Sequence, residues 1–383
     1  MDVEQSVRQR YSQAAQRVEP ELCCPVEYDP QYLRAIPREV LDRDYGCGDP
    51  SAHVRPGDVV LDLGSGSGKI CYIAAQVTGP GGRVIGVDAN DEMLGLARRY
   101  RREVGQRIGY HNVEFRKGRI QDLRLNLELV DAYLREHPIR STAGVTRFES
   151  FCQGIRQEQP MIADESVDVI LSNCVLNLVR PDDKQQLFAE MFRVMRLGGR
   201  VAISDIVSDE DVPDELRADP ELWSRCISGA YREEAFLDAF DQAGFYGMEI
   251  VKRDEKPWRT VQGIEFRSIT VVARKGKQGP CWERKQAVIY RGPWRRVMDD
   301  DGHVLERGKP MAVCDKTFQL YRREPYANHI IPVEALDLVP LEEATPFDCK
   351  RSTVRHPRET KGLEYDLTDL AGAACGEPGG DCC

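Results

Sequence analysis

The sequence has no long hydrophobic run. It contains no stretch of about 18 or more uncharged apolar residues, the length that a membrane-spanning helix needs. The N-terminus reads MDVEQSVRQRYSQ, so charged and polar residues stand where a signal peptide has its apolar segment. We therefore expect a soluble, cytoplasmic protein.

Concentrated charge of one sign is also absent. The 53 basic and 63 acidic residues give a net charge of −10 and are interleaved. Such a surface has no field that would attract nucleic acid or an anionic membrane. The six histidines show no metal-ligand spacing, so neither a zinc nor an iron site is expected. The expected partner is a small molecule.

Cysteine is abundant, but the chain has no C-x-x-C pair. The thirteen cysteines make up about 3% of the residues, well below the density of a small disulfide-bonded scaffold. The absence of a C-x-x-C pair argues against a zinc ribbon and against a thioredoxin-like redox site. In the cytoplasm such thiols stay mostly reduced, which leaves them free to bind soft ions or to act as redox couples.

Short apolar segments alternate with helical ones from residue 59 onwards. We expect strands at 59–63, 83–88, 113–117, 166–172 and 200–205, and helices at 69–76, 91–104 and 184–195. Residues 124–162 interrupt the alternation and are expected to form a helix-rich insertion. A late strand at 269–273 is expected to close the sheet. The pattern predicts an α/β fold with a doubly wound, mostly parallel sheet.

Prolines and changes of composition divide the chain. Residues 1–56 contain helical segments broken by prolines and are expected to form an N-terminal helical cap. Residues 57–275 would form the sheet domain, with an acidic, helical excursion at 208–243. Residues 281–345 carry short β-rich runs between turns, which predicts a small C-terminal α+β domain. Residues 346–383 are expected to be a flexible tail.

A glycine-rich turn follows the first expected strand. Gly64, Ser65, Gly66 and Gly68 stand between this strand and the next helix, where backbone N–H groups can approach a ligand closely. Asp88 ends the second strand, 24 residues after Gly64, and is placed to bind ribose hydroxyls. Sites for nicotinamide, flavin and S-adenosylmethionine share this geometry, so the turn alone does not distinguish them.

Asp62 indicates which of these cofactors is bound. It stands two residues before Gly64, where a carboxylate would repel the pyrophosphate of a dinucleotide but suits the cationic amino-acid tail of S-adenosylmethionine. Together with Gly-Val-Asp-Ala-Asn-Asp-Glu-Met-Leu after the second strand, the pattern resembles class I S-adenosylmethionine methyltransferases over roughly residues 57–205. The resemblance implies a seven-stranded sheet, with Ile120 and Gln121 flanking the adenine and Asn173 facing the cofactor. It also places Ala89 and Met93 in the cofactor pocket.

Two cysteines stand at the edge of the sheet where a ligand is expected, because parallel strands bring their carboxyl ends together there. Cys71 lies in the first turns of the helix after the glycine turn, and Cys174 follows the fourth strand. Cys226 lies in the 208–243 excursion, which can fold over the same crevice, and Cys47 lies in the cap. The alternative interpretation is that each is a small buried apolar residue, since free cysteine is among the most buried residue types.

Four motifs together resemble the arsenite methyltransferase family: Tyr-Gly-Cys-Gly, Gly-Ser-Gly-Ser-Gly-x-x-Cys-Tyr, Ser-Asn-Cys-Val-Leu-Asn-Leu and Cys-Ile-Ser-Gly-Ala. The resemblance covers most of residues 1–345. It implies that Cys174 and Cys226 bind trivalent arsenic with Cys71 as the third thiolate, and that Cys47 forms a disulfide with Cys71 during the cycle. It further implies arsenite or methylarsenite as substrate, and thioredoxin or glutathione as thiol reductant. A monomer is expected.

The remaining cysteines are assigned lesser roles. The pairs Cys23-Cys24 and Cys382-Cys383 are candidates for picking up arsenite, because vicinal thiols are good arsenic ligands. A structural or incidental role is expected for Cys152, Cys281, Cys314, Cys349 and Cys375.

Two other functions compete with arsenite methylation. One is a methyltransferase for a small organic substrate, in which the thiols are incidental. The other is a non-catalytic protein that sequesters arsenic, which would leave the glycine turn and Asp88 without a purpose. Loss of arsenite methylation in Cys174→Ser would argue against the first, and binding of S-adenosylmethionine would argue against the second.

Overall fold

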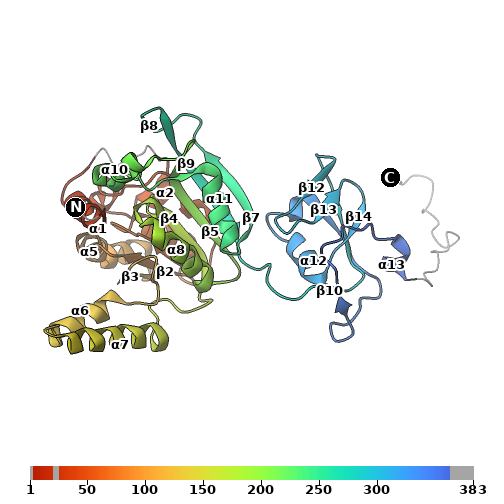
Figure 1. Cartoon of the computed structure of the whole chain (residues 1–383), viewed down its shortest axis with the longest axis horizontal. Coiled ribbons are helices and arrows are strands. Elements are labelled where there is room, and N and C mark those ends of the chain that lie inside the picture. Colours follow the sequence, from red (N-terminus) through yellow and green to blue (C-terminus); the bar gives the residue numbers. More distant parts are fainter. Residues whose placement is uncertain (1–2, 20–25, 363–383) are drawn as a thin grey trace. The chain divides into compact units, whose positions relative to one another are not determined.

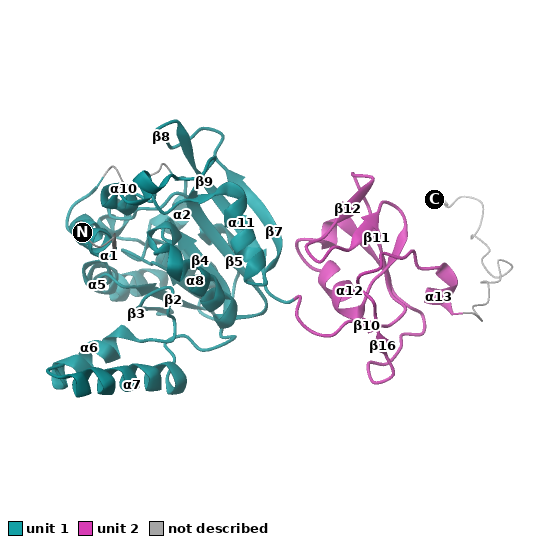
Figure 2. Ribbon diagram, in the orientation of Figure 1, with its two compact units in different colours: residues 1–276 teal, residues 277–383 magenta. Residues whose placement is uncertain are grey.

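A computed structural model describes residues 3–19 and 26–362. The chain forms two compact units, residues 1–276 and 277–383, which are coloured separately in Figure 2. The expected cap therefore belongs to the same unit as the sheet. The cysteine pairs at 23–24 and 382–383 and Cys375 lie outside the described residues.

A twisted sheet forms the centre of the first unit (Figure 1). Its main path, within the described residues, has the strand order β3-β2-β1-β4-β5-β9-β7. The bounds are β1 (Val59–Leu63), β2 (Arg83–Asp88), β3 (Val113–Lys117), β4 (Val167–Asn173), β5 (Met195–Ser208), β7 (Tyr246–Arg253) and β9 (Ile264–Arg274). The first five strands pair in parallel, and β9 runs antiparallel to both neighbours. The predicted class I methyltransferase fold is confirmed.

The late strand does not close the sheet as predicted. β9 lies between β5 and β7, so β7, which was not predicted, forms the edge. The burial of β7 explains the omission, because its last five residues, 249–253, are exposed and mostly polar and so lack the alternation of a half-buried strand. Two short strands, β6 (Tyr231–Arg232) and β8 (Arg259–Val261), extend the sheet beside β5 and β9.

Alternate residues of the central strands pack into two separate hydrophobic cores, one on each face of the sheet. Leu61 and Leu63 of β1 belong to a core with α8 (Pro181–Val194) and α11 (Glu233–Gln242), whereas Val60 belongs to one with α4 (Lys69–Thr78) and α5 (Asp91–Ile108). Successive side chains of a strand point to opposite faces, so helices cover both faces of the sheet. The carboxyl ends of β1, β2 and β4 remain available for a ligand.

Helices outside the sheet pattern complete the first unit. The cap consists of α1 (Val3–Ala14), α2 (Pro30–Leu33), α3 (Arg38–Asp42) and the 3-10 turn η2 (Pro50–His53). The insertion at 124–162 contains α6 (Leu127–Glu136) and α7 (Thr142–Glu158), as predicted. The excursion after β5 holds α9 (Asp214–Arg217) and α10 (Pro220–Ser224), and α10 packs beside α1. Another 3-10 turn, η3 (Leu176–Leu178), follows β4.

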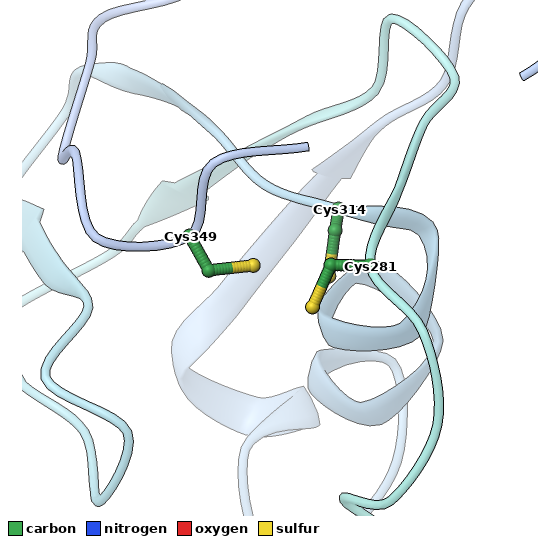
Figure 3. A group of neighbouring side chains, drawn as sticks. All are labelled: Cys281, Cys314 and Cys349. Carbon is green, nitrogen blue, oxygen red and sulfur yellow. The ribbon is translucent and has the colours of Figure 1, made fainter. Parts of the chain in front are cut away.

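The second unit is a small α+β structure. β11 (Ala287–Tyr290) pairs with β14 (Pro310–Ala312) and β15 (Ile330–Val333), and β12 (Arg296–Met298) pairs with β13 (Val304–Glu306). β10 (Trp282–Glu283) pairs with β16 (Thr345–Pro346). Its helical elements are α12 (Asp315–Tyr321), the 3-10 turn η4 (Ala327–His329) and α13 (Pro357–Lys361). Three cysteines of this unit lie next to one another, Cys281, Cys314 and Cys349 (Figure 3).

The second unit extends beyond its predicted end at residue 345. Residues 346–362, expected to be part of a flexible tail, contain the last residue of β16 and all of α13, and buried Arg355 donates hydrogen bonds to Glu283 over 2.7 and 2.9 Å. The prediction was wrong for this segment. It relied on low apolar content, whereas the segment is held by an ion pair to a residue 72 positions away, which composition does not reveal. None of the described helices has the length and apolar character that crossing a membrane requires.

Candidate active site

A cavity of about 560 Å³ opens at the carboxyl ends of β1, β2 and β4. Its volume lies in the range of small-molecule and cofactor sites. Ten of the eleven residues predicted to bind the cofactor line it: Asp62, Gly64, Ser65, Gly66, Asp88, Ala89, Met93, Ile120, Gln121 and Asn173. α1 supplies further lining residues, among them Arg8 and Tyr11, so the cap covers the cavity.

The glycine turn is held in a conformation that favours glycine. Gly64 and Gly66 have φ angles of +71° and +51°, in the left-handed region where a side chain is strained. The N–H groups of Gly64 and Ser65 both donate to the carbonyl of Val87. Gly68, the eleventh predicted residue, does not line the cavity. It caps α4, and a side chain there would collide with Phe115, so its role is close packing of helix on sheet.

Asp88 connects the end of β2 to the glycine turn. It accepts hydrogen bonds from the N–H groups of Gly66, over 2.9 Å, and Asn90, over 2.8 Å. Burial raises the pKa of Asp88, and these backbone hydrogen bonds oppose the rise. A carboxylate has about four lone-pair positions. Asp88 can therefore accept further hydrogen bonds from a diol in the cavity.

Asp62 provides a buried carboxyl at another side of the cavity. Only 2% of its surface is exposed, and the thiol of Cys71 donates a hydrogen bond to it over 3.1 Å. Burial raises the pKa of Asp62 to about 7, and the negative charges of Asp44 and Asp88 add to the rise. A cationic group beside Asp62 would offset this cost, which fits the ammonium group of an amino-acid tail.

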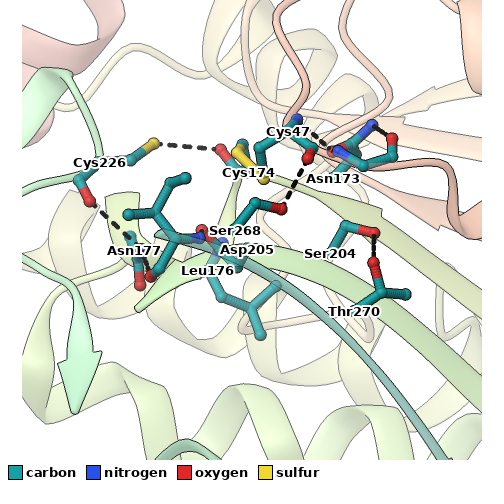
Figure 4. The surroundings of a disulfide bond; sticks show 12 residues. Cys47, Asn173, Cys174, Leu176, Asn177, Ser204, Asp205, Cys226, Ser268 and Thr270 are labelled. Carbon is teal, nitrogen blue, oxygen red and sulfur yellow. Dashed lines mark hydrogen bonds between the residues drawn. A yellow bond between two sulfur atoms is a disulfide. The ribbon is translucent and has the colours of Figure 1, made fainter. Parts of the chain in front are cut away.

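Three of the four predicted thiols converge next to this cavity (Figure 4). Cys47 and Cys174 form a disulfide, with Cα atoms 5.9 Å apart. The sulfur of Cys226 lies 3.3 Å from the carbonyl oxygen of Cys174. All three belong to one buried cluster, and Cys174 itself lines the cavity. Residues from the cap, the end of β4 and the 208–243 excursion thus meet, as the sequence predicted for these three.

Cys71 stands apart from the other three, contrary to expectation. It is fully buried in α4, packs in the core that contains Val60, and donates to Asp62. Burial raises the pKa of Cys71, and the charge of Asp62 adds to the rise, so a thiol is favoured over a thiolate. The expected Cys47–Cys71 disulfide is not the one that the structure contains, because Cys47 is bonded to Cys174.

The backbone at Cys174 and Cys226 is strained. Their φ angles are +58° and +62°, values that residues other than glycine adopt at a cost of about 1–3 kcal/mol each. Backbone hydrogen bonds to the carbonyls of Ser204 and Trp223 hold the two residues in place. Such strain is found most often at functional sites, where it fixes the direction of a side chain.

Asn173 does more than line the cavity. Its side-chain oxygen accepts from the N–H of Cys47 over 2.8 Å, and its side-chain nitrogen donates to the carbonyl of Gly48 over 2.7 Å. The hydroxyl of Ser268 donates to the carbonyl of Cys47 over 2.6 Å. Asn173 was predicted to face the cofactor, whereas its hydrogen bonds fix the loop that carries Cys47 against the end of β4.

Sequence reasoning missed three polar groups around the thiols, of which Asp205 and Lys184 are buried and Tyr11 is partly buried. Asp205 accepts from the N–H of Leu176 over 2.9 Å, and burial raises its pKa to about 6. The ammonium of Lys184 lies 4.0 Å from the ring centre of Tyr231, and burial lowers its pKa to about 8. The hydroxyl of Tyr11 forms a hydrogen bond with Cys226. Asp205 ends the predicted fifth strand and could have been found by that position, whereas nothing in the sequence relates Tyr11 to Cys226.

The sheet order, the glycine turn and the carboxyls of Asp62 and Asp88 define an S-adenosylmethionine-dependent methyltransferase of class I. Residues 55–244 match the family model described as a methyltransferase domain, and residues 277–365 match a domain of unknown function, DUF8838. The arsenite methyltransferase of Aquipseudomonas alcaligenes is 32% identical, with 80% of this chain and 83% of that protein aligned. This chain belongs to the arsenite methyltransferase family.

Two further relatives support this assignment. The arsenite methyltransferase of Mus musculus is 28% identical, with 89% of this chain and 83% of that protein aligned. The crystal structure of an arsenic (III) S-adenosylmethionine methyltransferase from Chlamydomonas reinhardtii is similar with a TM-score of 0.56 and 25% identity. It covers 87% of this chain and 100% of that chain, so the likeness extends over both units.

The raised pKa of Asp62 predicts that cofactor affinity depends on pH. Below about pH 7 the carboxyl of the free enzyme is neutral and cannot attract the ammonium group of S-adenosylmethionine. The dissociation constant should therefore increase by up to about tenfold per pH unit as the pH falls below 7, and level off above it. Calorimetry between about pH 5.5 and 8.5 measures this. In Asp62→Asn binding should be weaker and this pH dependence lost; an unchanged slope in that variant would refute the assignment.

Proposed function

We propose that this chain methylates trivalent arsenic held on the thiolates of Cys174 and Cys226. The observation that carries the proposal is the approach of the Cys226 sulfur to within 3.3 Å of the Cys174 carbonyl, beside a cavity that Cys174 lines together with Asp62 and Asp88. The two residues are 52 positions apart in the sequence, and both have left-handed backbones.

The residue types suit arsenic as a substrate. Trivalent arsenic is soft and binds thiolates in preference to carboxylates or hydroxyls. Bonds to sulfur leave its lone pair free, and S-adenosylmethionine, when bound, supplies an electrophilic methyl group on a sulfonium. The strained backbones of Cys174 and Cys226 fix where the arsenic is held and so orient its lone pair toward the cavity. No general base is needed, because arsenic loses no proton.

Cys47 and Cys174 are placed to return the arsenic to its trivalent state. Transfer of a methyl cation to the lone pair raises arsenic from the trivalent to the pentavalent state. The thiol of Cys47 can lose its proton and attack the sulfur of Cys174, which forms the disulfide that joins them in this structure. The bond between arsenic and Cys174 breaks in the same step, and its electron pair returns the arsenic to the trivalent state. An external thiol reductant, thioredoxin or glutathione, would then reduce this disulfide for the next cycle. In this scheme Cys47 pairs with Cys174, and Cys71 serves as a hydrogen-bond donor to Asp62.

We further propose that a single chain acts in the cytoplasm. One chain supplies every group assigned above, so the chemistry needs no second copy. The scheme also needs thiols that can be reduced again, which a reducing compartment provides.

The test is an incubation of the reduced chain with arsenite, S-adenosylmethionine and either glutathione or a thioredoxin system. Methylated arsenic species, separated by chromatography and measured by mass spectrometry, should form over many turnovers. Without added reductant, product should stop near one methyl group per chain, because the disulfide is not reopened. Turnover of S-adenosylmethionine on an organic acceptor, with none on arsenite, would contradict the proposal.

A further inference from the structure

The second unit contains a cluster of three cysteines that the proposed reaction does not use. The sulfur atoms of Cys281, Cys314 and Cys349 all lie within 4.8 Å of one another. Figure 3 shows the three side chains pointing toward a common centre. The side chain of Cys349 is hydrogen-bonded to those of Cys281 and Cys314. A structural or incidental role was expected for these cysteines, which are 33 and 35 residues apart in the sequence.

The fold of the unit brings the three thiols together from separate elements. Cys281 immediately precedes β10, and Cys349 follows β16, which pairs with β10. The N–H of Phe347 donates to the carbonyl of Cys281 over 2.9 Å, which fixes the first and last segments against each other. Cys314 precedes α12, and its sulfur accepts from the N–H of Thr317 over 3.4 Å. The buried ion pair from Arg355 to Glu283 ties the later segment to β10.

Three free thiols at this separation match the geometry of an ion-binding site. Metal–thiolate bonds are about 2.3 Å long, so an ion at the centre of the cluster would reach all three sulfurs with small movements. The cysteines are not joined as disulfides. Cys314 is buried, whereas Cys281 and Cys349 are partly exposed, so an ion has a route from solvent.

The donor set favours an ion that takes three sulfur ligands. A structural zinc ion is held by four protein ligands. Within residues 3–19 and 26–362, the only group of three or more histidine, cysteine or acidic side chains with ligand atoms this close is the cluster itself, which offers three. Trivalent arsenic forms three bonds to sulfur and keeps a lone pair in the fourth position, so three thiols complete its coordination. The choice of arsenic over other thiophilic ions rests on the function proposed above.

We propose that Cys281, Cys314 and Cys349 form a second arsenic site, separate from the methylation site, which binds trivalent arsenic through three thiolates. Arsenous acid brings three hydroxyl groups, and each leaves as water with the proton of one thiol as an As–S bond forms. No electrons are transferred. The site gives a role in arsenic binding to a domain whose matched family model carries no function.

The test uses the full chain with the other candidate ligands removed. In a background variant Cys23, Cys24, Cys47, Cys174, Cys226, Cys375, Cys382 and Cys383 are serine, which leaves the cluster, Cys71 and Cys152. Inorganic arsenite should bind this variant at one equivalent per chain, with three sulfur neighbours per arsenic by X-ray absorption spectroscopy. Adding Cys349→Ser, at a partly exposed position, should abolish that equivalent. Adding Cys152→Ser, the matched control in α7, should leave it unchanged.

Other outcomes overturn the inference. Absence of arsenite binding in a background variant whose circular dichroism matches the unaltered chain would refute it. One equivalent of zinc that copurifies with the unaltered chain, and disappears in Cys349→Ser, would show a zinc site instead. The result is independent of the methylation site: if the unaltered chain methylates arsenite but the background variant binds none, only the second site is wrong. If the background variant binds arsenic and the unaltered chain forms no methylated product, only the proposed function is wrong.

Discussion

Cys226→Ser is expected to lower the rate of arsenite methylation by about 100-fold or more while leaving the affinity for S-adenosylmethionine almost unchanged. The sulfur of Cys226 lies beside Cys174, and replacing it by oxygen removes one of two soft ligands from the arsenic. With one thiolate left, the arsenic is free to rotate, and its lone pair loses alignment with the methyl donor. The cofactor residues are untouched, since Cys226 does not line the cavity. Initial rates at saturating S-adenosylmethionine, with calorimetric binding of the cofactor alone, measure both parts.

Cys226 is chosen because its replacement should affect activity without disturbing the fold. Cys226 is not part of a disulfide, so its replacement leaves the Cys47–Cys174 disulfide intact, which Cys174→Ser would not. Serine is close in size to cysteine and retains a hydrogen-bonding group toward Tyr11. Cys152→Ser, at another buried thiol, is the matched control and should keep full activity. If Cys226→Ser methylates arsenite at the normal rate, Cys226 is not an arsenic ligand.

The cofactor residues were predictable because each stands close to a recognisable strand in the sequence. The glycine turn must lie between a strand and a helix, and Asp88 must end the next strand, so order along the chain places both at the same edge of the sheet. Ten of the eleven residues predicted to bind the cofactor line one cavity in the structure. Gly68 does not line the cavity. In a sequence, a glycine required for close packing against Phe115 cannot be distinguished from a glycine required for a ligand.

The thiol sites depend on contacts between distant residues, which spacing does not encode. The resemblance implied Cys71 as the third arsenic ligand and Cys47 as its disulfide partner, but the hydrogen bonds of Asn173 hold the Cys47 loop at the end of β4, and Cys71 donates a hydrogen bond to Asp62. The cluster in the second unit follows from the pairing of β10 with β16, two strands of two residues each, which are too short to be recognised in a sequence.

Asp88→Ala is expected to weaken binding of S-adenosylmethionine by about 100-fold. A carboxylate that accepts from both hydroxyls of a ribose forms two charge-assisted hydrogen bonds, each contributing about 1.5–3 kcal/mol. The change also removes the acceptor for the N–H of Gly66, which lies 2.9 Å away, so the glycine turn loses one of its supports. Because methyl transfer requires the bound cofactor, activity at low S-adenosylmethionine should fall in parallel and recover in part at high concentration. Calorimetry and a titration of the initial rate against S-adenosylmethionine test both statements.

The control for this change is Asp182→Ala, which removes an exposed carboxylate from the first turn of α8 and should leave the cofactor affinity unaltered. Thermal unfolding of Asp88→Ala separates loss of binding from loss of fold, since Asp88 also accepts a hydrogen bond from the N–H of Asn90 at the start of α5. Arsenite binding, measured without S-adenosylmethionine, should be retained in Asp88→Ala because the thiols of Cys174 and Cys226 do not depend on this carboxylate. An Asp88→Ala chain that binds the cofactor with normal affinity would show that the ribose is held elsewhere in the cavity.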